Sequence, residues 1–396
     1  MEINKNIKYF YLIIISLIIR LFITFFYVDN YNTVEDYQIA ENLAKGNGYV
    51  LYDLIGPTAI KVPLYPVMLS FFILIFNGLS KFAIVIFQHI LLLFCSYFIL
   101  KIGYELQKVR VSELFFLIFI FYPSYLYYPN VIEVTNVFIC ESIMFVYFSV
   151  KYYKLQSRQY LIILSILSGL IFLTQPIAVP IILAVWIYLL RNSITKIWVP
   201  LIVILLMQSP WIIRNYVVFD KFIPFKSPFW MNIYLGYHLP NFSNEDYDII
   251  DGKDVAMIDS LINSYVNDVE MEQYYRDVVL RTIKKDPILY IEKTFFQIFT
   301  YWWVPNQYLN DNRLEFVIAR KVPVFLLNLL TILSMVYLVR IYPKLIISMI
   351  LVFLYFTLTY ALTQTYNIRY KLDIEWLQFI AVTMYLERFI KKSTIF

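Results

Sequence analysis

Residues 29–66 read DNYNTVEDYQIAENLAKGNGYVLYDLIGPTAIKVPLYP, an acidic segment broken by glycine and proline that separates one apolar run from a series of further ones. The run before it, at residues 9–28, has the roughly 20 residues that a helix needs to cross a bilayer. Charged side chains between two such runs lie at the membrane boundary, where they are costly unless they serve a site. The segment therefore indicates a polytopic membrane protein and marks the first place to look for its chemistry.

The composition of this 396-residue chain argues against a soluble domain. Hydrophobic residues make up 61% of it, aromatic residues 19% and charged residues only 15%, a balance that a water-soluble domain of this size could not keep in solution. The net charge of +5 is small, and the basic residues lie mostly in short connections, so nucleic acid is not an expected partner. Cys95 and Cys140 lie within apolar runs, which gives no support to a disulfide framework or a thiolate metal cluster.

The other apolar runs predict an all-α fold. Runs long enough to span lie at 9–28, 82–100, 112–129, 134–150, 159–174, 176–191, 196–213, 322–340, 344–362 and 373–389. Two shorter runs, 63–79 and 288–304, are ambiguous between spanning, re-entrant and interface-lying helices. We expect a polytopic bundle of about ten to thirteen transmembrane helices. It forms one integral membrane domain over residues 1–396, with no large soluble domain.

The distribution of basic residues predicts the orientation. Lys5 and Lys8 precede the first run and no small-residue cleavage site follows it, so we expect an uncleaved first helix and a cytoplasmic N-terminus. If the 63–79 run does not cross, the following basic residues all fall on the cytoplasmic side: Lys101, Lys108, Arg110, Lys151, Lys154, Arg158, Arg191 and Lys196. Residues 29–80 then form a first external loop with juxtamembrane helices, and residues 214–287 an external cap. The codon-related excess of Ile, Phe, Tyr, Asn and Lys suggests a bacterial cytoplasmic membrane.

Glu35 and Asp36, directly before Tyr37, are the first candidates for catalysis. They open a short helix-like stretch, VEDYQIAENLAKG, where acids in the first turn favour the helix dipole or simply solvate a loop. The functional alternative follows from their place at the external interface. There a carboxylate could accept a proton from an acceptor hydroxyl while a lipid-borne substrate approaches from the membrane.

Four stretches in order resemble the GT-C type glycosyltransferases that use polyprenyl-phosphate sugars, a broad family that includes protein mannosyltransferases and aminoarabinose transferases. EDYQIAENLAKGNGYV, followed by KVPLYPVMLSFF, is similar to their first external loop. The other three are SPWIIRNYVVFDKFIPF at 209–225, YYRDVVLRTIKKDPILYIEK at 274–293 and IRYKLDIE at 368–375. The resemblance implies a GT-C-like bundle and inverting transfer of a sugar, on the extracytoplasmic face, from a polyprenyl-phosphate donor to a lipid, glycan or protein acceptor.

The chain departs from the family pattern at two points. Many members carry the acid three or four positions before the tyrosine, or as an Asp-Glu pair, whereas here both acids directly precede Tyr37. A glycine common after the Arg-Asn-Tyr stretch is replaced by Asp220. Both carboxylates therefore stay candidates for the catalytic base, with Asp36 preferred to Glu35.

Cations near the membrane edge are candidates for binding the donor phosphate. Loss of a polyprenyl phosphate builds negative charge, and a guanidinium matches phosphate oxygens in pairs. Arg214 and Arg369 are the main candidates, with Lys61 and Lys371 as alternates, although interface anchoring explains such residues as well. Tyr37 and Tyr370 flank the acids and Arg369, and we expect them to contribute to substrate binding.

Two buried acids and one histidine complete the candidates. Glu133 and Glu141 lie in YYPNVIEVTNVFICESIMF, and at least one is expected to face the substrate cleft, because a glutamate in an apolar helix needs a partner or a cavity. His238, in the large external loop, could bind a divalent metal together with an acid of the first loop, although a lone histidine more often makes a loop hydrogen bond. His89 lies in an apolar run and is interpreted as a packing residue.

Other functional classes fit the sequence less well. No phosphate-binding glycine loop or nucleotide fingerprint is visible, which disfavours a soluble nucleotide-sugar donor. A transporter or flippase for lipid-linked glycans would also need many spans, but it would typically show repeated halves and polar residues near mid-membrane. A polymerase acting on lipid-linked oligosaccharide diphosphates is a further alternative.

Overall fold

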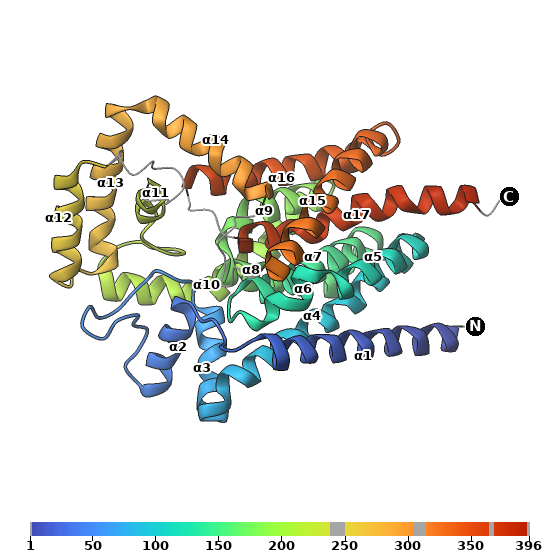
Figure 1. Ribbon diagram of the computed structural model, residues 1–396, viewed down its shortest axis with the longest axis horizontal. Helices are drawn as coiled ribbons and strands as arrows, with labels where there is room; N and C mark the ends of the chain where they lie inside the picture. Colours follow the sequence, from blue (N-terminus) through green and yellow to red (C-terminus); the bar gives the residue numbers. More distant parts are fainter. Residues whose placement is uncertain (1, 238–249, 304–313, 364–367, 394–396) are drawn as a thin grey trace.

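The computed structural model describes residues 2–237, 250–303, 314–363 and 368–393, and within these ranges the chain is helical. Extended pairing in the described ranges is limited to two isolated bridges, Thr33 with Ile132 and Val50 with Pro57. The predicted all-α fold is confirmed (Figure 1).

The α-helices of the described ranges are labelled in chain order. They are α1 (Glu2–Tyr27), α2 (Glu35–Lys45), α3 (Leu64–Phe76), α4 (Ser80–Glu105), α5 (Val109–Phe121), α6 (Pro123–Tyr127), α7 (Thr135–Leu155), α8 (Arg158–Thr174), α9 (Val179–Leu190), α10 (Trp198–Phe219), α11 (Trp230–Tyr237), α12 (Gly252–Asn263), α13 (Asp268–Lys285), α14 (Pro287–Trp303), α15 (Leu314–Leu338), α16 (Pro343–Thr363) and α17 (Ile368–Ser393). Short 3₁₀ turns lie at Asn77–Leu79, Tyr128–Asn130, Pro176–Ala178 and Ile194–Ile197.

Every predicted apolar run coincides with helix, but few helices are both long and apolar. By length and composition five helical stretches in the described ranges could cross a membrane: Ile7–Tyr27, Leu64–Glu105, Ile194–Phe219, Lys321–Leu338 and Pro343–Thr363. A sixth arises if Val109–Phe121 and Pro123–Asn130, bent by 54°, count as one span. The number of candidate spans is below the predicted ten to thirteen because proline breaks several runs and because α7 and α17 carry charged residues. These apolar helices identify the chain as a multi-pass membrane protein.

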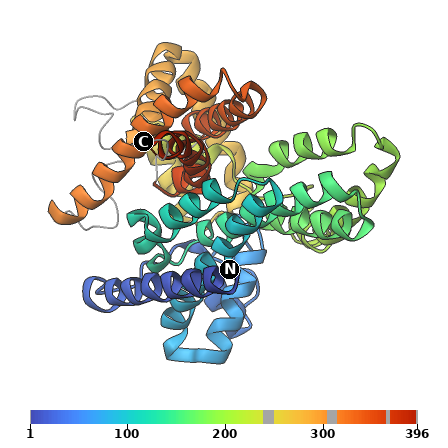
Figure 2. The same cartoon turned by 90° about the vertical axis from the view of Figure 1, so that its right-hand side faces the viewer.

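The helices form a bundle with a cap at one end. In Figure 1 both termini lie at the right-hand end of the bundle, and α2 and α11–α13 lie at the opposite end. Seen along the bundle in Figure 2, α8–α10 lie to one side of the central helices α4–α7. Many large apolar side chains point outward, for example Phe26, Ile75 and Leu206, as expected for helices surrounded by lipid. We call the end that carries α2 and α11–α13 the cap end.

Charges at the terminal end of the bundle fit the predicted pattern of basic connections. Lys151 Nζ, near the end of α7, lies 2.5 Å from Glu105 Oε1 at the end of α4, and Lys154 Nζ lies 3.6 Å from Glu105 Oε2. These contacts bring the connections after α4 and α7 to the same end, as the charge distribution required.

The two polar segments predicted to be external, 29–80 and 214–287, lie against each other at the cap end. Thr58 Oγ1 donates to Asp268 Oδ2 at 2.7 Å, and Ala59 N donates to the same oxygen at 3.1 Å. Ser227 N in turn donates to Ala59 O at 2.9 Å. The second segment, predicted as a cap, contains α11, α12 and α13, whose apolar faces share a small core of their own.

Candidate active site

Helix α2 carries Glu35 and Asp36 in its first turn. The extended segment before it pairs with the connection before α7, because Ile132 N donates to Asn32 O at 2.9 Å and Thr33 forms a parallel bridge with Ile132. This pairing brings the first acidic segment beside the segment that carries Glu133. Asp36 is 2% exposed, whereas 45% of the Glu35 side chain is exposed.

A cavity of about 240 Å³ lies at the cap end between α2, the connection after α8, the α10–α11 connection and the facing ends of α16 and α17. Its polar lining includes Asp36, Lys61, Gln175, Lys226, Asn232 and Arg369. Its aromatic lining includes Tyr65, Phe229, Tyr355, Tyr360 and Tyr370. One carboxylate and three cations from four separate parts of the chain therefore share one cavity.

Lys61 joins the two acids of α2. Its Nζ lies 3.2 Å from Glu35 Oε2 and 3.7 Å from Asp36 Oδ2. Asp36 Oδ2 is buried and has no hydrogen-bond partner among the described residues. It is therefore a carboxylate oxygen that can still accept a hydrogen bond, held close to a cation.

The environment separates the pKa values of the two acids. Burial raises the pKa of Asp36, and the Lys61 ammonium offsets this only in part. Burial also acts to raise the pKa of Glu35, but the Lys61 charge, a backbone hydrogen bond and Arg369 together lower it. Desolvation acts to lower the pKa of Lys61, but the Asp36 and Glu35 charges raise it. Adjacent titratable groups with diverging pKa values are typical of acid and base sites.

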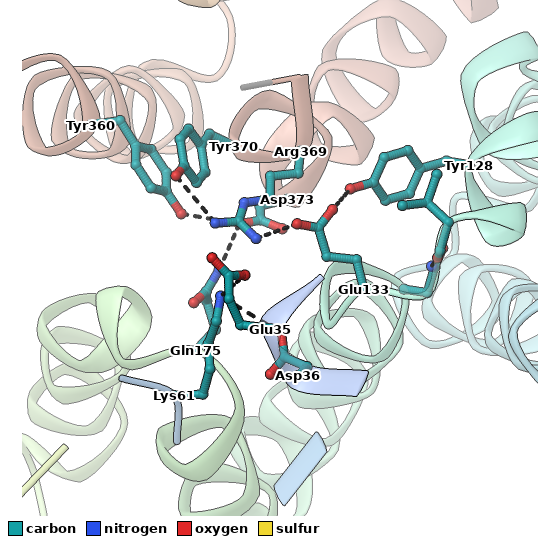
Figure 3. A network of polar contacts seen from close by, with 12 residues as sticks. Glu35, Asp36, Lys61, Tyr128, Glu133, Gln175, Tyr360, Arg369, Tyr370 and Asp373 are labelled. Carbon is teal, nitrogen blue, oxygen red and sulfur yellow. Dashed lines mark hydrogen bonds and ion pairs between the residues drawn. The ribbon is translucent and has the colours of Figure 1, made fainter. Parts of the chain in front are cut away.

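Arg369, in the first turn of α17, is held between acidic and aromatic groups (Figure 3). Its Nη1 forms an ion pair with Glu133 Oε1, and Glu133 Oε2 accepts a hydrogen bond from the Tyr128 hydroxyl. Its Nη2 donates to the Tyr370 hydroxyl at 3.2 Å. The Tyr370 ring stacks on Tyr360 with centroids 4.0 Å apart. These contacts fix the guanidinium at the cavity wall.

Asp373, one turn further along α17, supports the same wall. Its Oδ2 accepts hydrogen bonds from Gln175 Nε2 at 3.0 Å and from the Tyr360 hydroxyl at 3.1 Å. Gln175 and Tyr360 both line the cavity. Asp373 therefore ties the connection after α8 to the end of α16, as Figure 3 shows.

The segment that presents Glu133 is fixed from behind by Gln88 of α4. Gln88 Nε2 donates to Pro129 O at 2.8 Å and to Val131 O at 3.0 Å. Gln88 Oε1 accepts from the hydroxyl of Tyr65, a cavity residue, at 2.7 Å. Since Gln88 is fully buried, these bonds are shielded from water and hold Glu133 in one place.

Lys226 was not predicted from the sequence. It lines the cavity, and no ion pair or hydrogen bond of its side chain is present within the described residues. Desolvation lowers the pKa of Lys226 to about 8, and the neighbouring Lys61 and Arg369 charges act in the same direction. It lies directly after the stretch 209–225 that resembles the family. A single lysine in a polar connection carries no local signal for a site.

Arg214, by contrast, does not line the cavity. Its Nη1 donates to Thr58 O and to Asn215 Oδ1, each at 2.8 Å, and its Nη2 donates to Tyr49 O at 3.2 Å. Its guanidinium also lies over the Tyr49 and Trp211 rings. The Tyr49 hydroxyl donates to Lys61 O at 3.0 Å, so Arg214 holds the segment from which Lys61 reaches the cavity.

The remaining predicted residues divide by position. Tyr370 lines the cavity, whereas Tyr37 is buried beside it, with its hydroxyl 3.0 Å from Ser80 Oγ. Glu141 lies one layer behind the wall, where its Oε1 accepts from Thr174 Oγ1, a cavity residue, at 3.1 Å. Lys371 is buried away from the cavity, in an ion pair with Glu375 at 2.7 Å.

The metal prediction receives no support from the part of the chain that the structure describes. That part holds no group of three or more His, Cys, Asp or Glu residues placed to bind a metal ion. His238 lies outside the described residues. His89 is buried, with its Nε2 3.1 Å from Thr24 Oγ1, as expected for a packing residue.

A comparison with protein families supports the resemblance drawn from the motifs. Residues 60–213 match the model of the dolichyl-phosphate-mannose-protein mannosyltransferase family. This confirms the predicted GT-C resemblance over that stretch. The crystal structure of ArnT from Cupriavidus metallidurans bound to undecaprenyl phosphate is similar with a TM-score of 0.45 and 12% sequence identity, over 96% of this chain and 77% of that chain. No curated protein matches the chain.

Proposed function

We propose that this chain is a GT-C type membrane glycosyltransferase that moves a sugar from a polyprenyl-phosphate donor to a lipid, glycan or protein acceptor. The observation that carries the proposal is the cavity at the cap end, which Asp36 lines together with Lys61, Lys226 and Arg369. A transfer from a lipid phosphate needs these two kinds of group side by side, a base for the acceptor and cations for the leaving group. The mannosyltransferase family match supports a lipid-phosphate donor.

In the proposed reaction Asp36 is the general base. Its Oδ2 accepts the proton of the acceptor hydroxyl as the hydroxyl oxygen attacks the anomeric carbon of the sugar. The bond between that carbon and the phosphate oxygen breaks, and the phosphate leaves with the bonding electron pair. Attack from the face opposite the leaving group inverts the anomeric configuration. The raised pKa of Asp36 makes its carboxylate a stronger base than an exposed aspartate.

The cations act on the other side of the sugar. Arg369, already oriented by Glu133 and Tyr370, can present two N–H groups to phosphate oxygens. Lys226 and Lys61 add positive charge in the same cavity. The negative charge that develops on the leaving phosphate is thus stabilised by groups positioned beforehand.

The stacked rings of Tyr360 and Tyr370 give the cavity a flat aromatic wall. Such a surface suits the apolar face of a sugar ring. We place this end of the bundle on the extracytoplasmic side of a bacterial inner membrane, because the predicted cytoplasmic N-terminus lies at the opposite end (Figure 1).

The test is transfer of label by the purified protein in lipid nanodiscs. We expect product from a radiolabelled polyprenyl-monophosphate monosaccharide in the presence of a bacterial membrane extract as acceptor source. Neither a nucleotide sugar nor a polyprenyl-diphosphate oligosaccharide should serve as donor. Flipping of labelled lipid across vesicles without any product would instead support a transporter, and use of the diphosphate donor would support a polymerase.

A further inference from the structure

Helix α14 turns a lysine away from the lipid. One face of this helix is apolar and exposed, with Ile288, Ile291, Phe295 and Phe299 each more than half exposed. The opposite face is buried and carries Lys293 and Gln297, which are 0% and 2% exposed. A lysine on an interface helix normally extends its ammonium group to water. Buried placement of such a charge is costly and is a sign of function.

Several polar atoms at and around Lys293 have no hydrogen-bond partner within the part of the chain that the structure describes. Lys293 Nζ lies 5.0 Å from the centre of the Tyr237 ring and 5.2 Å from that of Tyr290, but no described residue forms a hydrogen bond with it. The same is true of both amide atoms of Gln297 and of the Tyr237 hydroxyl. Buried polar atoms without partners usually cost stability and call for an explanation. Four of them come from three neighbouring side chains here.

Gly236 of α11 allows the helix to approach this cluster. A Cβ at Gly236 would lie 2.7 Å from Lys293 Nζ and 3.4 Å from Gln297 Nε2. The ammonium and amide groups therefore point at the backbone of α11. Because the atoms are buried in this structure, binding of a ligand to them requires α11 to move away from α14.

The cluster adjoins the cavity of the proposed reaction. Asn232, one turn before Gly236 on α11, lines that cavity. On the other side, the Tyr290 hydroxyl donates to Leu362 O at 2.8 Å, and the next residue, Thr363, also lines the cavity. A molecule bound with one end at Asp36 could thus place another group at Lys293.

We propose that Lys293, Gln297 and Tyr237 form a second subsite that binds the carboxylate or phosphate of a negatively charged sugar acceptor. This inference rests on the proposed function, since the acceptor is the substrate of that reaction. An ammonium, an amide and a phenol supply donors for anionic oxygens and for the hydroxyls of a sugar. The subsite selects acceptors by charge, whereas the cations of the main cavity bind the donor phosphate.

Binding of small anionic sugars tests the subsite directly. The probes are glucuronate, which carries a carboxylate, glucose 1-phosphate, which carries a phosphate, and neutral glucose. We expect one or both anionic sugars to bind the wild-type protein in nanodiscs more tightly than glucose does. Lys293→Met should weaken that binding about 10-fold or more, as expected for loss of a charged hydrogen bond. The matched control is Lys284→Met, which removes the same charge from an exposed position on α13 and should leave binding unchanged.

A purely structural role of Lys293 predicts a different result. Replacing a buried, unpartnered charge by an apolar side chain of similar length should leave the melting temperature unchanged or raise it. A structural role would instead lower it and leave anion binding intact. Gly236→Ala provides a second variant if Lys293→Met does not fold, because its Cβ would displace the ammonium, and it too should weaken binding.

Two results would overturn the subsite. One is equal binding of all three sugars to the wild type, and the other is unchanged anionic binding in both variants. Either could occur while the wild type still transfers label from the polyprenyl-phosphate donor, in which case only the subsite is rejected. Absence of any transfer by the wild type would reject the proposed function itself.

Discussion

Arg214 and Arg369 look alike in the sequence, but the structure gives them different partners. Both lie in helices near the cap end, beside motifs that resemble the same family. Arg214 donates to two backbone carbonyls and a side-chain amide in what we call the clamp region, formed by Arg214, Tyr49 and Thr58. Arg369 faces the carboxylate of Glu133 at the wall of the cavity region, formed by Asp36, Lys61 and Arg369.

The different partners indicate different roles for the two guanidinium groups. Backbone carbonyl oxygens of a packed segment need a hydrogen-bond donor and are fixed in place, so an arginine that binds them has the structural role of holding that segment. A carboxylate partner orients the guanidinium through two of its five donors at most, and the group can still meet a phosphate. We therefore assign donor binding to Arg369 and a positioning role to Arg214, and four predictions test this division.

The largest effect should come from Asp36 in the cavity region. Asp36→Asn keeps the size of the side chain but removes the base, so we expect kcat to fall about 1000-fold. Glu35→Gln is the matched control, because that side chain is 45% exposed and already pairs with Lys61. It should change kcat only a few-fold. Equal losses in both variants, measured by label transfer, would reject the preference for Asp36.

Arg369→Met should give the next largest effect. Removing a charged group from a developing phosphate charge costs about 100-fold in kcat/KM. Arg369→Lys should recover part of it, since a point charge is kept but paired N–H donation is lost. Steady-state kinetics over a range of donor concentrations measure both. Wild-type kinetics in Arg369→Met would mean that the phosphate binds elsewhere.

Arg214→Met should lower activity about 10-fold and should also lower stability. The variant leaves the carbonyls of Thr58 and Tyr49 without their donor, at a cost of about 1–3 kcal/mol. Thermal unfolding should report the loss. A loss of activity as large as that of Arg369→Met with unchanged melting would place Arg214 in the site and contradict the division.

The smallest effect concerns pH. Lys226 has a pKa lowered to about 8, so it is charged below that pH and neutral above it. Donor affinity should fall a few-fold as pH rises through about 8. Lys226→Arg stays charged, so donor affinity in this variant should no longer fall above about pH 8. Activity should still fall at acidic pH in that variant, because Asp36 has a raised pKa and must lose its proton to act as base. If donor affinity still falls above about pH 8 in Lys226→Arg, a group other than Lys226 must titrate in that range.

The sequence predicted the helices and part of the site. Apolar runs of sufficient length locate helices because burial in lipid is decided by local composition. Asp36, Lys61, Arg369 and Tyr370 were predicted, and the structure brings them to one cavity. At least one of Glu133 and Glu141 was expected to face the cleft, but neither lines this cavity. Glu133 instead pairs with Arg369, and Glu141 accepts a hydrogen bond from Thr174.

What the sequence could not predict depends on long-range pairing. Arg214 was a candidate for the phosphate beside Arg369, but its partners come from a segment more than 150 residues earlier in the chain. Lys226 and Gln175 reach the cavity only through the way in which the connections after α10 and α8 are folded back. No local pattern of charge or hydrophobicity encodes such contacts, whereas helix periodicity is local.

The most direct test of the account is an experimental structure of the protein in lipid nanodiscs with bound polyprenyl phosphate. We predict that the phosphate oxygens lie within hydrogen-bonding distance of Arg369 and of Lys61 or Lys226, in the cavity that Asp36 lines. A phosphate bound at Arg214, with no lipid headgroup in that cavity, would contradict it.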